Sequence, residues 1–155
     1  DSSSVIEFML QSNENFIVIE SNNDAGSEVI FSLYAKTPET SRIRFFPSMR
    51  FEYFLALLKG AKTIIGNSSA GVREAPYFGV PAVNLGSRQL NRASSPLIVN
   101  CEFSPSSIEV GFQKALGLPR TPAGEFGEGA SAGKFAAVLG RDDFWATSIQ
   151  KQFLD

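Results

Sequence analysis

Two small hydroxyl residues follow a short apolar run in the middle of the chain, at a place suited to binding an anion. Residues 62–67, KTIIGN, are typical of a buried strand that ends at a glycine, and Ser68 and Ser69 come directly after it. We call residues 66–71, GNSSAG, the serine turn. If a helix starts here, its first backbone N–H groups lack internal acceptors and can hold a phosphate together with the two hydroxyls. The same residues fit a second interpretation, in which Ser68 or Ser69 only caps the helix.

Three charged residues follow the serine turn at positions that suit the rest of a nucleotide. Glu74 falls in the first turns of the predicted helix, where a carboxylate either complements the helix dipole or accepts hydrogen bonds from sugar hydroxyls. Arg88 and Arg92 belong to residues 86–92, GSRQLNR, which we call the arginine loop. Arginine binds phosphate through paired hydrogen bonds and stacks on bases, but each of these arginines also fits a solvated surface role.

Several other chemistries are excluded by residue type. The serine turn lacks both the G-x-S-x-G elbow of serine hydrolases and the Lys-Ser/Thr pair of a P-loop. Asn67-Ser68-Ser69 matches an N-glycosylation sequon, and we expect this match to be fortuitous. The 155 residues contain no histidine, the commonest general base and metal ligand. We therefore expect no Ser-His triad, no metal site and no cofactor. Cys101, the single cysteine, has no neighbouring cation to activate it and fits a reducing cytoplasm.

The elements around these residues alternate between strand and helix patterns. Strands are predicted at residues 16–21, 41–48, 62–67, 81–86 and 96–102, and helices at residues 1–12, 28–37, 50–61, 70–79 and 104–118. Residues 22–27, NNDAGS, are typical of a turn, and the last helix is predicted to be capped by Ser104 with Pro105 at its first position. This order predicts an α/β fold, with a Rossmann-like parallel sheet and helices on both faces.

The chain is predicted to form one domain, residues 1–155, with a distinct carboxy-terminal part. Residues 118–132 are rich in glycine and proline and are expected to form an exposed loop. Residues 133–155 are expected to form one or two helices that dock through a set of apolar side chains: Phe144, Trp145, Ile149 and Phe153. A net charge of −2 argues against a nucleic acid or an anionic membrane as partner, and no apolar run is long enough to span a bilayer. The first residues lack the basic start of a secretory signal, so the predicted location is cytoplasmic.

Residues 64–92, IIGNSSAGVREAPYFGVPAVNLGSRQLNR, resemble the signature of the hydrolysing UDP-N-acetylglucosamine 2-epimerases. The match is closest to the branch that makes precursors of sialic and legionaminic acids, and FFPSMRFEYFLALLKGAKT, NNDAGSE and GEGASAGKFAAVL fit that branch as well. The resemblance covers nearly the whole chain. It implies the carboxy-terminal half of a two-domain enzyme of the glycosyltransferase-B type, in which a UDP-sugar lies between two Rossmann-like halves.

Carried over by position, the resemblance implies a role for each candidate residue. Ser68 and Ser69, completed by the backbone of Ala70 and Gly71, would hold the diphosphate, and Glu74 would hold the ribose hydroxyls. Nucleotide contacts are implied for a further set that includes the uracil pocket: Phe46, Met49, Phe54, Arg88 and Arg92.

The reaction that the resemblance implies begins with removal of the sugar C2 proton and loss of UDP, after which water adds with inversion at C2. The acids and bases come mainly from the amino-terminal half, with one histidine near the start of the carboxy-terminal half that this sequence lacks. We therefore expect no catalytic residue here and an inactive isolated chain. Its expected partners are the UDP-sugar, UDP and a missing amino-terminal domain, within a homodimer. Two alternatives remain, the donor-binding half of a nucleotide-sugar glycosyltransferase and a non-catalytic nucleotide-binding module.

Overall fold

The computed structural model describes residues 2–20, 27–38, 40–127 and 129–148. It divides into two compact units, Asp1–Glu125 and Phe126–Asp155, and the division falls within the predicted loop at residues 118–132. The described residues between 119 and 130 belong to no helix or strand. The predicted turn at residues 22–27 lies almost wholly outside the described residues.

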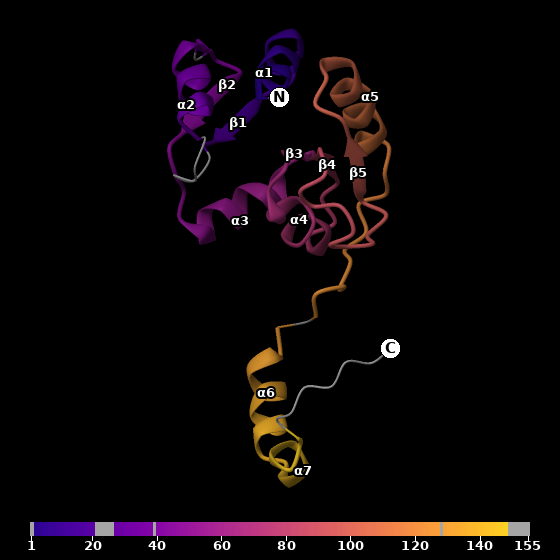
Figure 1. The fold of residues 1–155 in the computed structure, drawn as a ribbon. Helices are drawn as coiled ribbons and strands as arrows, with labels where there is room; N and C mark the ends of the chain where they lie inside the picture. The colour runs from indigo at the N-terminus through magenta and orange to yellow at the C-terminus, as the bar shows by residue number, and fades with distance from the viewer. Residues whose placement is uncertain (1, 21–26, 39, 128, 149–155) are drawn as a thin grey trace. The chain divides into compact units, whose positions relative to one another are not determined.

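The first unit alternates strands and helices in the predicted order (Figure 1). Its elements are α1 (Ser2–Gln11), β1 (Phe16–Ile19), α2 (Ser27–Lys36), β2 (Ile43–Phe46), α3 (Phe51–Gly60), β3 (Ile64–Gly66), the 3₁₀ turn η1 (Ser69–Gly71), α4 (Glu74–Tyr77), β4 (Ala82–Leu85), β5 (Ile98–Cys101) and α5 (Pro105–Leu116). All five predicted strands are confirmed. Helix α5 begins as predicted, because the Ser104 hydroxyl accepts a hydrogen bond from the Ser107 N–H and Pro105 stands at the first position.

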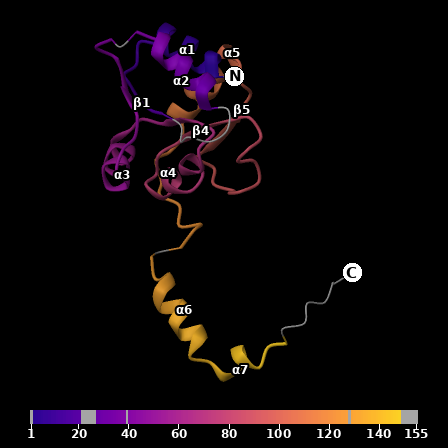
Figure 2. The same cartoon turned by 60° about the vertical axis from the view of Figure 1, so that its left-hand side comes forward.

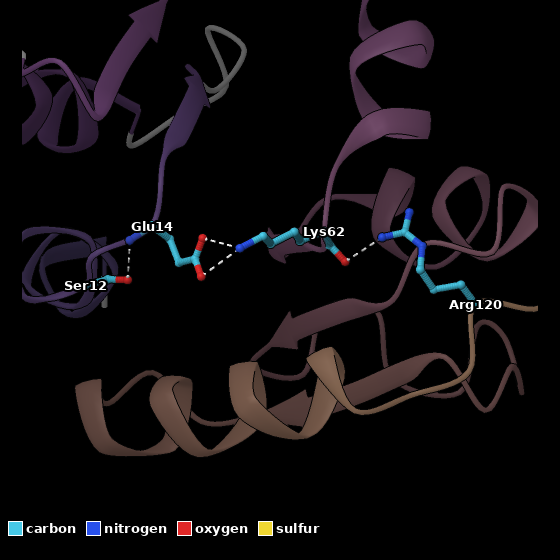
Figure 3. Close-up of polar contacts among 4 residues, drawn as sticks. All are labelled: Ser12, Glu14, Lys62 and Arg120. Carbon is cyan, nitrogen blue, oxygen red and sulfur yellow. Dashed lines mark hydrogen bonds and ion pairs between the residues drawn. The ribbon is translucent and has the colours of Figure 1, made fainter.

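The five strands are all paired in parallel, but in two ladders rather than the single sheet that the pattern predicts. One ladder joins β1 to β2 and the other follows the order β3-β4-β5. The segments that lead into β1 and β3 are joined by an ion pair, in which the Lys62 ammonium lies 2.7 Å from the Glu14 carboxylate (Figure 3). The Lys62 carbonyl also accepts a hydrogen bond from Arg120, at 3.4 Å. The ion pair is exposed, and such pairs contribute about 0.2–1 kcal/mol. The two ladders also share one buried cluster, in which Val18 and Ile43 lie with residues of β4 and β5: Val83, Leu85 and Val99.

The β3-β4-β5 ladder is covered on both faces, as Figures 1 and 2 show. Helices α1 and α5 pack on one face, where the rings of Phe8 and Phe112 lie 5.4 Å apart beside the buried Leu85. Elements η1, α4 and α3 lie on the other face, where Leu58 packs against α4. All four residues of β4 are buried as a result. The β1–β2 pair differs, because Ile17 is 51% exposed and the helix that follows β2 packs against α4 instead.

The described part of the second unit contains two helices, α6 (Ser131–Leu139) and α7 (Asp142–Trp145), where one or two helices were expected over residues 133–155. The Trp145 indole N–H donates to the Leu139 carbonyl at 2.8 Å, and the Trp145 ring makes an edge-to-face contact with Phe144. Neither helix contains a buried residue. Docking through Phe144 and Trp145 stays a prediction, and Ile149 and Phe153 lie outside the described residues. None of the described helices has both the length and the apolar character that a membrane span requires.

Candidate functional site

The serine turn lies at the carboxyl end of β3, and its residues 67–69 are exposed. Both interpretations of the turn, as a helix cap and as a phosphate site, can be compared with its hydrogen bonds. Gly66 leaves the strand at φ +147°, a backbone conformation that other residues rarely adopt. The Ser68 hydroxyl accepts a hydrogen bond from the Ala70 N–H at 3.3 Å, so the capping interpretation is confirmed for Ser68. That hydroxyl still has its own proton to donate, because a hydroxyl is both acceptor and donor. The cap therefore leaves the turn able to donate to an anion.

The backbone donors of the turn are only partly available. The N–H groups of Ala70 and Gly71, which the resemblance assigns to the diphosphate, already donate to the hydroxyl and the carbonyl of Ser68. Among the described residues, no acceptor is present for the N–H groups of Ser68 and Ser69, and both residues are exposed. An incoming phosphate would therefore first meet these two amides and the two serine hydroxyls.

The helix after the serine turn is much shorter than predicted. In place of one helix over residues 70–79, the structure has the single turn η1 and the four-residue helix α4. The physical reason is Pro76, which has no N–H and whose ring conflicts with the carbonyl four residues earlier, while Gly79 turns the chain away at φ +68°. A helix of one turn has little dipole, so the part of the anion prediction that relied on a helix dipole is wrong.

Glu74 stands at the start of α4 with an unusual environment. Its side chain is half-buried, and its Oε2 atom is buried without a hydrogen-bond partner among the described residues. A buried acceptor left without a donor costs about 1–3 kcal/mol, so proteins rarely keep one without use. The missing donor is thus expected from a ligand or from another part of the protein.

Gln89 is a site residue that sequence reasoning missed, and it brings the two loops together. Its side chain is 3% exposed and donates from Nε2 to the Asn67 carbonyl at 3.0 Å. The guanidinium of Arg92 donates from Nη1 to Gln89 Oε1 at 3.4 Å, and both Arg88 and Arg92 are exposed. The arginine loop therefore lies against the serine turn. No local pattern marks a glutamine in a polar loop as buried, so only the fold reveals this role.

A second buried amide lies next to the serine turn, in the middle of a strand. Asn84 on β4 is 2% exposed and pairs in register with Gly66 and Asn100. Its Nδ2 donates to Asn100 Oδ1 at 2.8 Å, and its own Oδ1 is buried with no partner among the described residues. The strand pattern at residues 81–86 did not indicate that this polar residue is buried.

The residues predicted to hold uracil lie on the approach to α3 and within it. Phe46 is the last residue of β2 and is 39% exposed, and Met49 is half-buried just before α3. Phe54 packs against the cluster that contains Ala75, the neighbour of Glu74, and its ring stacks on Phe51 at 6.4 Å. The structure therefore places Phe54 beside α4. Surface hollows of about 400 and 410 Å³ lie elsewhere, between β5 and α5 and between α1 and α2.

Comparisons with known proteins identify the family of the chain. The family model for UDP-N-acetylglucosamine 2-epimerase matches residues 3–140. The chain is 40% identical to the UDP-N-acetylglucosamine 2-epimerase of Neisseria meningitidis serogroup B, over 93% of this chain and 39% of that protein. It is 30% identical to the UDP-N,N′-diacetylbacillosamine 2-epimerase (hydrolyzing) of Legionella pneumophila, over 76% of this chain and 31% of that protein.

A solved structure shows the same fold. The UDP-GlcNAc 2-epimerase of Methanocaldococcus jannaschii, in complex with UDP-GlcNAc and UDP, superposes with a TM-score of 0.73 at 18% identity, over 88% of this chain and 38% of that chain. This chain thus spans about two fifths of the length of these proteins or less, and its fold is that of part of a glycosyltransferase-B-like enzyme. Because the family model matches most of the chain, the chain belongs to the UDP-N-acetylglucosamine 2-epimerase family.

Proposed function

We propose that this chain is the UDP-binding half of a hydrolysing UDP-N-acetylglucosamine 2-epimerase of the branch that supplies sialic and legionaminic acid precursors. Its substrate is UDP-N-acetylglucosamine or UDP-N,N′-diacetylbacillosamine. The observation that carries the proposal is that Oε2 of Glu74, close in sequence to the serine turn, is buried and has no partner in the described ranges of the chain. Ribose hydroxyls are donors of the right kind for this oxygen, and a ribose bound there would place its diphosphate near Ser68 and Ser69.

In this proposal the chain holds the leaving group and the rest of the enzyme moves protons. A base takes the C2 proton while the bond from C1 to the UDP oxygen breaks, and the electron pair leaves with UDP. Water then adds its hydroxyl to C1 and a proton to C2 from the opposite face. The serine turn stabilises the departing diphosphate through hydroxyl and amide donors, with Arg88 supplying positive charge. The backbone N–H groups of Ala70 and Gly71 can donate to the diphosphate only if they give up their present hydrogen bonds to Ser68.

The setting of the enzyme is part of the same proposal. The sequence has no histidine and the chain spans 39% of the Neisseria relative, so the acids and bases are assigned to the remaining part of the enzyme. Alone, the chain is then inactive and binds UDP weakly. We place the complete enzyme in the cytoplasm as a homodimer. The glycosyltransferase and non-catalytic alternatives are outcomes of the test below.

The test follows the sugar C2 position in the full-length gene product. UDP-N-acetylglucosamine and its diacetamido analogue are incubated in D₂O and followed by proton NMR. A hydrolysing epimerase releases UDP and the free 2-epimeric sugar with one deuterium at C2. Retention of UDP on the epimerised sugar would show a non-hydrolysing epimerase. Release of UDP that needs an acceptor and leaves C2 protonated would show a glycosyltransferase, and binding without turnover would show a non-catalytic module.

A further inference from the structure

The Gln89 side chain is buried between two groups that make opposite demands on it. On one side the Asn67 carbonyl oxygen, which can only accept, receives a hydrogen bond from Nε2 at 3.0 Å. On the other side the Arg92 guanidinium, which can only donate, gives a hydrogen bond to Oε1 at 3.4 Å. A primary amide satisfies both demands at once, whereas a carboxylate of the same shape satisfies only the second. The arrangement therefore accounts for glutamine, and not glutamate, at this position.

This amide joins the two segments that carry the candidate ligand groups. Asn67 immediately precedes Ser68, so the hydrogen bond acts at the first residues of the serine turn. Gln89 immediately follows Arg88, so the same bond fixes the arginine loop at the residue next to its exposed guanidinium. Because the side chain is only 3% exposed, water competes little for its hydrogen bonds. The serine turn and the arginine loop follow the paired strands β3 and β4, and this buried amide adds a direct hydrogen bond between the two loops beyond the end of the ladder.

We propose that Gln89 is a positioning residue for the diphosphate, one that fixes the arginine loop against the serine turn so that both engage the same ligand. The inference rests on the proposed function, because the diphosphate is the ligand assumed. Arg92 acts through Gln89, because its guanidinium orients the amide so that Nε2 faces the Asn67 carbonyl. This role differs from the direct nucleotide contact that the sequence resemblance implies for Arg92.

The test replaces Gln89 in the full-length gene product and varies the number of phosphates on the ligand. Gln89→Glu keeps the shape and the acceptor for Arg92 but sets two acceptors against each other at Asn67. Gln89→Met removes both hydrogen bonds without adding charge and serves if the first variant does not fold. Gln113→Glu is the matched control, because Gln113 is exposed on α5 and its amide donates to Glu109, its neighbour one helical turn earlier. Calorimetry gives the dissociation constants and the stoichiometries for UDP, UMP and uridine.

We expect Gln89→Glu to weaken UDP binding by about 5- to 100-fold, the range for an unmade buried hydrogen bond. The loss should be smaller for UMP and at most about twofold for uridine, which has no phosphate to be positioned. The stoichiometry should stay at one, and Gln113→Glu should bind all three ligands as the wild type does. An equal loss for all three ligands, or no loss for UDP, would overturn the inference. If the wild-type protein binds none of the three ligands, the proposed function itself fails and this inference fails with it.

Discussion

Replacing Glu74 by glutamine should stabilise the unliganded protein. In the wild type, Oε2 is buried and has no donor within the part of the chain that the structure describes, and a buried unpaired acceptor costs about 1–3 kcal/mol. Glutamine has nearly the same volume, and its amide oxygen or nitrogen takes the place of Oε2 without a full charge, so the part of this cost that comes from burying a charged acceptor is removed. We take the low end of the range, about 1 kcal/mol, because the side chain is only half-buried and part of it stays in solvent. The melting temperature should rise by about 2–4 °C for a protein of 150–250 residues, and by less for a longer one.

The same change should weaken nucleotide binding, because hydrogen bonds to a charged acceptor are about twice as strong as those to a neutral one. A loss of about 1.5 kcal/mol corresponds to roughly a tenfold weaker affinity. The loss should appear for uridine as much as for UDP, since the ribose is common to both. It should be smaller for 2′-deoxy-UDP, which lacks one of the hydroxyl donors. The pattern is thus distinct from that of Gln89→Glu, where the loss grows with the number of phosphates.

Glu52→Gln is the matched control for both measurements. Glu52 also lies in the first turn of a helix, α3, but its side chain is 75% exposed and its contact with Arg50 is a surface pair at 4.0 Å. Its replacement should change the free energy of unfolding and the affinity by less than about 0.5 kcal/mol. Thermal unfolding without ligand and calorimetry with uridine, UDP and 2′-deoxy-UDP complete the assay. If Glu74→Gln lowers the melting temperature, or leaves uridine affinity unchanged, the reasoning about the unpartnered oxygen is refuted.

Three further predictions concern single side chains. Ser68→Ala should lower the free energy of unfolding by about 0.5–2 kcal/mol, because it removes the cap of η1. Ser69→Ala should instead weaken UDP binding without a change in stability. Denaturant titration separates the two variants, because only the first should change the free energy of unfolding. Gly111→Ala should lower the free energy of unfolding by about 1–3 kcal/mol, because the added methyl carbon would lie 2.1 Å from the Cys101 sulfur. Its control is Gly133→Ala on α6, where the added carbon meets nothing within 4 Å and should raise the free energy of unfolding by about 0.5–1 kcal/mol. Burial raises the pKa of the Cys101 thiol and outweighs a hydrogen bond from a neighbouring serine that lowers it, so less thiolate is present at a given pH. Alkylation of Cys101 by iodoacetamide in the native protein should therefore need a higher pH than alkylation of a free thiol. Equal rates for the two thiols would contradict this.

Local patterns in the sequence were enough to predict the order of the strands and the start of α5. Apolar runs of β-branched residues mark strands, and a serine before a proline marks a helix start, because both signals come from neighbours along the chain. The family and the residues of the serine turn were also accessible in this way, because the turn and α4 form one continuous segment. The capping and phosphate-binding interpretations of Ser68 are compatible, because its hydroxyl can accept from the Ala70 N–H and still donate to a phosphate.

Long-range contacts decided the rest. Whether β1 pairs with β3 depends on two segments that are far apart in sequence, and no local signal could show that they are joined by Lys62 and Glu14 without a ladder. The burial of Gln89 and the unpartnered oxygen of Glu74 depend on which elements pack around them. A side chain's type states what it can donate or accept, but only the packed fold determines which partners remain for it and which must come from a ligand.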